Sequence, residues 1–349
     1  MKKLVGLLLI LTMMMTTVAC GSKATNDAES TTSEGGSNEV IEIKLGANLP
    51  KGTPITDACF KFEEELEART DGKVDVIVFP AGQLGGGREM IESLQFGSLE
   101  MVESTLGPFA GFNKEFLAFN LPYLFKNRDV AYEFLDGAIA DEMRESVIKD
   151  GFKILAFWDN GYRNVSNSVK AIKTPSDLDG MKIRTMENPV HMEAFKQAGA
   201  NPTPMAFTEV FTALQQKTVD GQENSFTNTA AMKFNEVQDH VSTTNHFYDV
   251  TAFIINPEFF DGLPSDIQTA VLESAEVATE FQRQATIEAD KLNEEKVAGT
   301  STITYLSDEE KLAFKKAMEG TYDEFRDQIG AEKLDQIIAE LDRIEASIN

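Results

Sequence analysis

A run of 33 residues without glycine or proline, residues 266–298, most constrains the fold of this chain. Such a run favours one continuous α-helix, because glycine and proline are the residues that most destabilise a helix interior. At 1.5 Å per residue the helix would be about 50 Å long, whereas a small domain is only about 30 Å across. Ser265 and Gln268 predict a capping box at its start. We therefore expect the helix to bridge two domains, and 349 residues are enough for two.

The chain before this helix alternates between predicted strands and predicted helices. Thr53 followed by Pro54 is a typical helix start, and the glycines at 85–87 lead into a second predicted helix, residues 88–96. Four segments are predicted to be strands, the first two because their apolar residues alternate: 41–45, 74–78, 153–158 and 181–186. This order of elements favours an α/β fold with largely parallel sheets.

The N-terminus has the features of an export signal. Lys2 and Lys3 precede a mostly apolar stretch that is shorter than the roughly 20 residues of a membrane-spanning helix. It ends in small residues followed by Cys20, as in a bacterial lipobox. We therefore predict that residues 1–19 are a signal peptide and that Cys20 carries a lipid anchor, with a plain cleavage site as the alternative. Residues 20–39 contain no large apolar side chain and predict a flexible tether.

Composition argues against several classes of function. The formal net charge is -25 and no run of five basic residues occurs, so a nucleic-acid partner is not expected. Besides Cys20 the sequence has only Cys59, which is predicted to lie in the core, and it has no CxxC pair for a metal. Sequence motifs of zinc proteases, hydrolases and nucleotide-binding loops are also missing. We expect a binding protein without cofactor or metal, not an enzyme.

Two arginines are candidates for binding an acidic ligand. Arg184 lies in the predicted strand 181–186, where the two-residue alternation turns it away from Ile183 and the core. Arg163 follows a predicted turn at 159–162. A guanidinium binds a carboxylate through two parallel hydrogen bonds, although either arginine could instead form an ordinary ion pair.

The stretch after residue 198 predicts a polar loop close to such a site. Residues 199–204 predict a turn, and Thr208 is predicted to cap a short helix. Gly221 is predicted to break the chain after that helix. We expect this break to bring Asn224 to an accessible edge.

A series of motifs between residues 41 and 261 occurs in a specific order and spacing: FPAGQLGGGREM, LPYLF, WDNGYR, TPSDLDGMKIRTMENPV, GANPTP, FTEVFTALQQKTVDGQENS, FNEVQDH and TTNHFYD. In these motifs the chain resembles the solute-binding proteins of TRAP transporters, the DctP family. The resemblance implies a two-lobed, periplasmic-binding-protein-like α/β fold with a long helix spanning both lobes. The expected boundaries are 40–160 plus 250–289 for lobe I and 161–249 plus 290–349 for lobe II.

The resemblance also implies a ligand site between the lobes. Arg184, in the KIR motif, is expected to make the main salt bridge to a ligand carboxylate, and Arg163 and Asn224 are expected to line the same cleft. Asn48 and Glu89 match positions that often contact the distal end of the ligand. An acidic residue facing two arginines favours hydroxyl donors, so we expect a sugar acid such as a uronate or aldonate. A C4-dicarboxylate is the main alternative.

The function implied by the resemblance is capture of a small carboxylate by hinge closure and its delivery to a separate membrane permease. A binding protein that serves an ABC importer or a sensor kinase is the less favoured alternative, which the sequence itself does not exclude. The sequence also leaves open whether Trp158, Phe226 and His246 contact the ligand.

Overall fold

The computed structural model of the chain describes residues 40–348, so the predicted signal peptide, Cys20 and the predicted tether lie outside the described residues. This part contains nine strands: β1 (Ile41–Gly46), β2 (Val74–Phe79), β3 (Met101–Thr105), β4 (Lys153–Asn167), β5 (Lys182–Thr185), β6 (Asn201–Pro204), β7 (Gly221–Asn224), β8 (His240–Ile255) and β9 (Thr302–Thr304). They form one sheet in the order β2-β1-β3-β8-β4-β7-β5-β6, with β9 beside β8. The predicted α/β class and the four predicted strand segments are confirmed.

Helices connect and cover these strands. The α-helices of the described part are α1 (Pro54–Arg69), α2 (Gly87–Gln95), α3 (Leu106–Phe109), α4 (Arg128–Leu135), α5 (Ala138–Ser146), α6 (Pro189–Gln197), α7 (Val210–Gln215), α8 (Phe226–Ala231), α9 (Pro257–Gly262), α10 (Ser265–Ala298), α11 (Asp308–Met318), α12 (Gly320–Ile329) and α13 (Ala331–Ile348). Its 3₁₀ helices are η1 (Lys114–Asn120), η2 (Ile148–Asp150), η3 (Pro175–Leu178), η4 (Phe207–Glu209) and η5 (Phe234–Glu236). Within residues 40–348, no helix combines the length and the apolar character needed to cross a bilayer.

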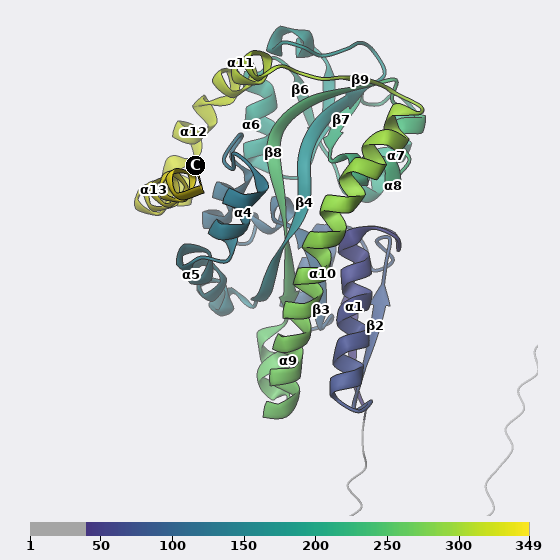
Figure 1. Ribbon diagram of the computed structural model, residues 1–349, viewed down its shortest axis with the longest axis vertical. Helices are drawn as coiled ribbons and strands as arrows, with labels where there is room; N and C mark the ends of the chain where they lie inside the picture. Colours follow the sequence, from purple (N-terminus) through teal and green to yellow (C-terminus); the bar gives the residue numbers. More distant parts are fainter. Residues whose placement is uncertain (1–39, 349) are drawn as a thin grey trace, which may run out of the picture. The chain divides into compact units, whose positions relative to one another are not determined.

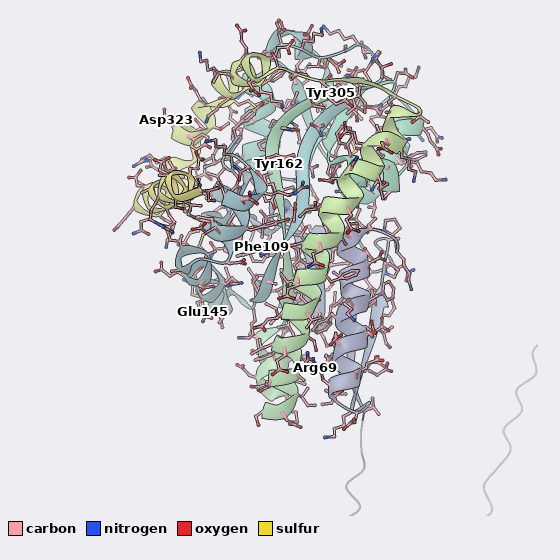
Figure 2. All side chains as sticks on the ribbon, in the orientation of Figure 1. Arg69, Phe109, Glu145, Tyr162, Tyr305 and Asp323 are labelled. Carbon is pink, nitrogen blue, oxygen red and sulfur yellow. The ribbon has the colours of Figure 1, made fainter. Side chains whose placement is uncertain are left out.

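The sheet has two parts, one with β1, β2 and β3 and the other with β5, β6, β7 and β9, and the long strands β4 and β8 run through both. The predicted long helix is α10, which lies against both parts. It packs on α1, on β4 and, farther along, on α8 and β9 (Figure 1). Near its start, Glu273 pairs at 2.7 Å with Arg69, which Figure 2 labels at the far end of α1. The predicted capping box at Ser265 is wrong: Gln268 donates instead to the backbone oxygen of Phe260 and so ties α10 to α9.

Two long antiparallel strands, β4 and β8, join the two parts of the sheet (Figure 1). One end of β8 pairs with β3 and the other with β9, whereas β4 pairs with β7 through residues 164–167. The outer pairs, β1–β2, β1–β3, β5–β6 and β5–β7, are parallel. The predicted turn at 159–162 is wrong, because a bulge beside Gly161, with φ +86°, lets the chain continue as strand β4.

Apolar side chains cover both faces of the sheet. Along β8, Phe253 and Ile255 belong to a core shared with α1 and α10, while Ala252 and Ile254 belong to a core shared with α4 and α5. This alternation is the two-residue period of a strand. Phe109, labelled in Figure 2, is buried in the second of these cores. A separate core packs β5 against α6 and α11 in the other part of the sheet.

Three expectations for the stretch after α6 are wrong. The predicted turn at 199–204 is strand β6 at the edge of the sheet, where a proline can turn its missing N–H away from the ladder. Gly221 does not break the chain but begins β7, where a Cβ would lie 2.3 Å from the backbone oxygen of Ser166 on β4. Thr208 lies within η4, and α7 starts without a side-chain cap. Close strand pairing therefore replaces the predicted loop.

Candidate ligand-binding cavity

A cavity lined from both parts of the sheet brings together four of the five predicted ligand-binding residues. It encloses about 570 Å³, counting the space that opens to solvent. Asn48 reaches it from the loop between β1 and α1. Arg163 on β4, Arg184 on β5 and Asn224 on β7 reach it from the other part of the sheet. The fifth predicted residue, Glu89, does not line this cavity.

Arg184 is buried at the cavity, and within residues 40–348 it forms no ion pair with an acidic residue. Its Nε and Nη2 donate to the backbone oxygen of Met205 at 3.1 and 2.7 Å, while Nη1 has no hydrogen-bond partner among the described residues. Burial lowers the pKa of Arg184 to about 10, because the charged form loses solvation and the charge of Glu223 offsets only part of that loss. At neutral pH this guanidinium is therefore charged and has unused donors.

Arg163 is equally buried but is bound by two acids. Its Nε and Nη2 donate to the carboxylate of Glu223, Nη2 also donates to the Glu223 backbone oxygen at 2.6 Å, and Nη1 donates to Asp249 at 2.7 Å. Burial alone would lower the pKa of Arg163, but the two carboxylates raise it above its ordinary value. In return, Arg163 holds the pKa of Glu223 well below its ordinary range despite burial. Arg163 thus ties β4 to β7 and β8.

Asn224 is buried in an interior strand, so the prediction of an accessible edge is wrong: β7 lies between β4 and β5. Its Nδ2 donates to Gln222 at 2.9 Å, and its Oδ1 accepts from Asn228 Nδ2 at 3.0 Å. The same Asn228 Nδ2 lies 3.0 Å from Asn160 Oδ1. All three asparagines line the cavity. Sequence reasoning missed Asn160 and Asn228, which become neighbours of Asn224 only when β4, β7 and α8 come together.

The acidic residue that lines the cavity from the β1 side is Glu103 on β3, which sequence reasoning also missed. Its Oε1 accepts the backbone N–H of Asn48 at 2.5 Å, and its side chain is buried. Burial raises the pKa of Glu103 to about 7, although the N–H groups of Asn48 and Leu49 act in the opposite direction. The sequence feature that could have identified Glu103 is an ionisable residue inside the short buried strand MVEST.

Glu89 has a local role in helix α2. Its carboxylate accepts the N–H of Gly86 at 2.8 Å, just before the first residue of the helix. A glutamate at the third helical position commonly bonds back in this way. This bond directs Glu89 to the helix terminus, whereas Gly87 and Arg88 of the same helix line the cavity.

Contacts beside the cavity join the two parts of the sheet around Gly107. Asn188 Nδ2 donates to the Gly107 backbone oxygen at 2.9 Å, and Thr105 Oγ1 lies 3.3 Å from the sulfur of Met186. A Cβ on Gly107 would lie only 2.8 Å from the Met186 sulfur. Glycine at this position therefore permits the close approach.

The three residues that the sequence left open do not line this cavity. His246 is buried, with Nδ1 2.7 Å from Thr244 Oγ1. Trp158 donates from Nε1 to Thr279 in the core beneath α10, and Phe226 packs against a small core near β9. Within the described part of the chain, no group of three or more His, Cys, Asp or Glu residues is arranged to hold a metal ion.

Comparisons with known proteins cover most of the chain. The family of bacterial extracellular solute-binding proteins, family 7 (DctP), matches residues 45–328. The 2,3-diketo-L-gulonate-binding periplasmic protein YiaO of Escherichia coli K12 is 38% identical over 263 residues, which cover 75% of this chain and 79% of that protein.

Solved structures give the same result. The sugar acid binding protein DctPAm of Advenella mimigardefordensis, in complex with galactonate, has a TM-score of 0.85 and 33% identity and covers 88% of this chain and 99% of its own. A TRAP periplasmic solute-binding protein of Sulfurospirillum deleyianum with bound succinate has a TM-score of 0.82 and 34% identity, with coverage of 85% and 98%.

These matches include both parts of the sheet and α10, so the predicted two-lobed fold is confirmed. The proteins matched bind solutes and are not enzymes. This chain therefore belongs to the DctP family of bacterial extracellular solute-binding proteins, the receptors of TRAP transporters.

Proposed function

We propose that this receptor captures one small organic acid, a hydroxylated sugar acid, and that Arg184 holds its carboxylate. The observation that carries this proposal is the buried Nη1 of Arg184, which has no hydrogen-bond partner at the cavity. A buried cation without a counter-charge is unfavourable. A ligand carboxylate supplies the charge and accepts parallel N–H bonds from the guanidinium.

The other proposed contacts have smaller roles. Arg163 has one N–H left after its four bonds to Glu223 and Asp249, so it contributes one donor at most to a ligand. The amides of Asn224 and Asn48 supply neutral polar groups. Glu89, bonded to Gly86, shapes helix α2 without touching the ligand.

The choice of a sugar acid follows from the relatives and from the cavity together. The names of two similar proteins record diketo-gulonate and galactonate, which are hydroxylated or oxo-bearing monocarboxylates. The cavity likewise offers one unpaired guanidinium and several hydrogen-bonding groups. A C4-dicarboxylate is the second candidate, favoured by the similar structure that contains succinate.

We propose that capture works by closure of two lobes, 40–160 plus 250–289 and 161–249 plus 290–349. Gly161 and the neighbouring register shifts in the β4–β8 ribbon supply a place for the strands to bend. Closure is favoured by a ligand only to the extent that the ligand contacts the closed form better than the open one.

We propose that residues 1–19 are removed as a signal peptide, that Cys20 becomes the lipidated N-terminus, and that the residues up to 39 tether the receptor near its permease at the bacterial cell membrane. A Cys20→Ala variant then loses incorporation of radiolabelled palmitate and leaves the membrane fraction. Retention of the label by the variant contradicts this part. Co-purification of the receptor with TRAP permease subunits distinguishes this role from service to an ABC importer or a sensor kinase.

The experiment that tests the ligand proposal is a thermal-shift panel of aldonates, uronates, keto acids and C4-dicarboxylates. A ligand at 100 times its dissociation constant stabilises the folded state by about 2.7 kcal/mol, which is a shift of several degrees. We expect the largest shift from a hydroxylated monocarboxylate. No shift with any acid contradicts the proposal.

Two variants then test, in the same assay, whether Arg184 is the clamp, that is, the residue that holds the ligand carboxylate. Arg184→Met removes the charge and is expected to abolish the shift. Arg184→Lys keeps the charge but loses the planar fork, so it is expected to retain a reduced shift. The matched control is Arg343→Met, because Arg343 is an exposed arginine on α13 paired with Glu340. An unchanged shift in Arg184→Met rules out this residue as the clamp.

A further inference from the structure

Glu103 is a carboxyl without a cation at the wall of the ligand cavity. It is 1% exposed, and among residues 40–348 it accepts hydrogen bonds from backbone N–H groups and forms no ion pair. Arg163, which also lines the cavity, is already bound to Glu223 and Asp249. Within the described residues, no cation therefore pairs with the Glu103 carboxyl.

Asn48 places a second acceptor beside this carboxyl. Its Nδ2 donates to the Glu103 backbone oxygen at 3.3 Å, which orients the amide, and its backbone N–H donates to Glu103 Oε1. Its Oδ1 is buried and has no hydrogen-bond partner in the described part of the chain. Because a carboxylate offers about four lone-pair positions, Glu103 can accept further bonds. This part of the cavity thus presents acceptors and needs donors from its ligand.

The two parts of the cavity consequently call for different chemistry. Arg184 offers N–H donors and one uncompensated positive charge, which suits one carboxylate. Glu103 and Asn48 Oδ1 offer acceptors, which suit hydroxyl groups. A second ligand carboxylate beside Glu103 would add a like charge in a buried place, and like charges there disfavour ionisation of both groups.

We propose that Glu103, together with Asn48 Oδ1, is the specificity determinant that selects hydroxyl-bearing monocarboxylates and rejects dicarboxylates. This inference rests on the proposed function, because it takes Arg184 as the holder of the first carboxylate. It differs from the sequence expectation, which gave the acidic role at this end to Glu89.

The test compares affinities of galactonate, erythronate and glucuronate with that of succinate by isothermal titration calorimetry. In the wild type, the best hydroxylated acid is expected to bind at least 100-fold more tightly than succinate. Glu103→Gln keeps the size of the side chain and an acceptor oxygen. In this variant, the ratio of the affinity for the hydroxylated acid to the affinity for succinate is expected to fall at least tenfold, mainly because succinate binds more tightly. The matched control is Glu100→Gln, because Glu100 also accepts a backbone N–H, from Lys44, but does not line the cavity.

A second variant keeps the test valid if Glu103→Gln folds poorly. Asn48→Ala removes the side-chain acceptor and its weak bond to β3, so it is expected to weaken binding of the hydroxylated acid about tenfold more than binding of succinate. Equal weakening of both acids contradicts the selective role.

The pH dependence supplies an independent readout. Asp249 on β8 and Cys59 on α1 interact electrostatically with Glu103, and the other charged residues that line the same cavity are Arg88, Arg163, Arg184 and Glu187. A ligand hydroxyl donates to the ionised form of Glu103, so affinity for the hydroxylated acid is expected to rise on the order of tenfold from pH 6 to pH 8. In Glu103→Gln the same affinity is expected to stay flat.

The possible outcomes separate the two proposals. If no acid binds to the wild type, the proposed function itself is contradicted. If succinate is the preferred ligand of the wild type, or if Glu103→Gln changes both classes of acid equally, the receptor function stands and the role of Glu103 is overturned.

Discussion

Two buried arginines at one cavity differ in what they touch. Arg163 donates four hydrogen bonds to Glu223 and Asp249, and its pKa lies above the ordinary value. Within residues 40–348, Arg184 donates only to the backbone oxygen of Met205, and its pKa falls to about 10 because it is buried. In our account, Arg163 is part of the folded framework, whereas Arg184 is a charge whose partner arrives with the ligand.

The difference arises from the strands beside each arginine. Arg163 on β4 lies where β7 and β8 both supply a carboxylate. Arg184 on β5 lies opposite Thr203 of β6 and Gln222 of β7, and both of these neighbours are neutral. Burial and residue type are therefore the same for the two arginines, and the neighbouring strands decide which one is left to bind an anion.

The largest expected effect is on stability, from Arg163→Met. This variant leaves Glu223 and Asp249 buried without their cation, and breaking a buried pair in this way costs about 3–5 kcal/mol. The free energy of unfolding from urea denaturation is the measurement. Adding Glu223→Gln to the variant is expected to recover part of the loss. A loss below about 1 kcal/mol would show that the pairing is not structural.

The next effect is on binding, from Arg184→Met. We expect affinity for the best acid to fall by two to three orders of magnitude, since removal of one partner of a buried charge pair costs about 2–5 kcal/mol. The stability of the ligand-free protein is expected to stay equal or to rise, because an unpaired buried cation is removed. Calorimetry and urea denaturation on the same samples measure both. A large loss of stability without a loss of affinity reverses the assignment of the two arginines.

Two buried carboxyls, Glu103 and Glu223, extend the comparison to pH. The pKa of Glu103 is raised from 4.5 to about 7, so its contribution to stability is complete below pH 4.5 and is lost as pH rises through 7. Glu103→Gln removes this dependence. From pH 4 to pH 8, the free energy of unfolding of the variant is therefore expected to rise relative to that of the wild type by up to about 3 kcal/mol. Urea denaturation of the ligand-free proteins at both pH values is the measurement.

The contribution of Glu223 to stability changes with pH in the opposite direction, so Glu223 serves as the control for that experiment. Its pKa is held well below 4.5, so its contribution is present above pH 4.5 and is lost as pH falls below that value. The loss of unfolding free energy caused by Glu223→Gln is therefore expected to be larger at neutral pH than at acidic pH. The same pH profile for both variants contradicts the distinction between a paired and an unpaired carboxyl.

The smallest expected effect concerns closure, from Gly107→Ala. The added methyl group would meet the Met186 sulfur at 2.8 Å, and a flexible methionine can yield, so we expect a loss of about 1 kcal/mol in binding, or about fivefold in affinity. Adding Met186→Ala is expected to restore part of it. An affinity of Gly107→Ala equal to that of the wild type indicates that this contact does not limit closure.

Sequence alone predicts the elements well where a local period or a motif defines them. The alternation in β1 and β2 and the uninterrupted run in α10 are both present in the structure. Sequence fails where neighbouring strands override local signals. Prolines in β6 and Gly221 in β7 look like turn residues, yet one strand is an edge and the other needs glycine for close approach.

The same limit applies to the cavity. Arg184 and Arg163 are found from motifs, but only the pairing of β4, β7 and β8 shows that one of them is occupied by acids. Glu103 sits in a short buried strand without a motif, and its position beside Asn48 depends on the pairing of β1 with β3. Contacts between distant segments therefore carry the information that the sequence lacks.

A crystal structure of the protein with its best-binding acid is the most direct test of the central claim. We predict that the ligand carboxylate accepts hydrogen bonds from Arg184 Nη1 at about 2.7–2.9 Å, while Arg163 remains bonded to Glu223 and Asp249. A ligand carboxylate held by other groups, with Arg184 still bonded only to Met205, would contradict the account.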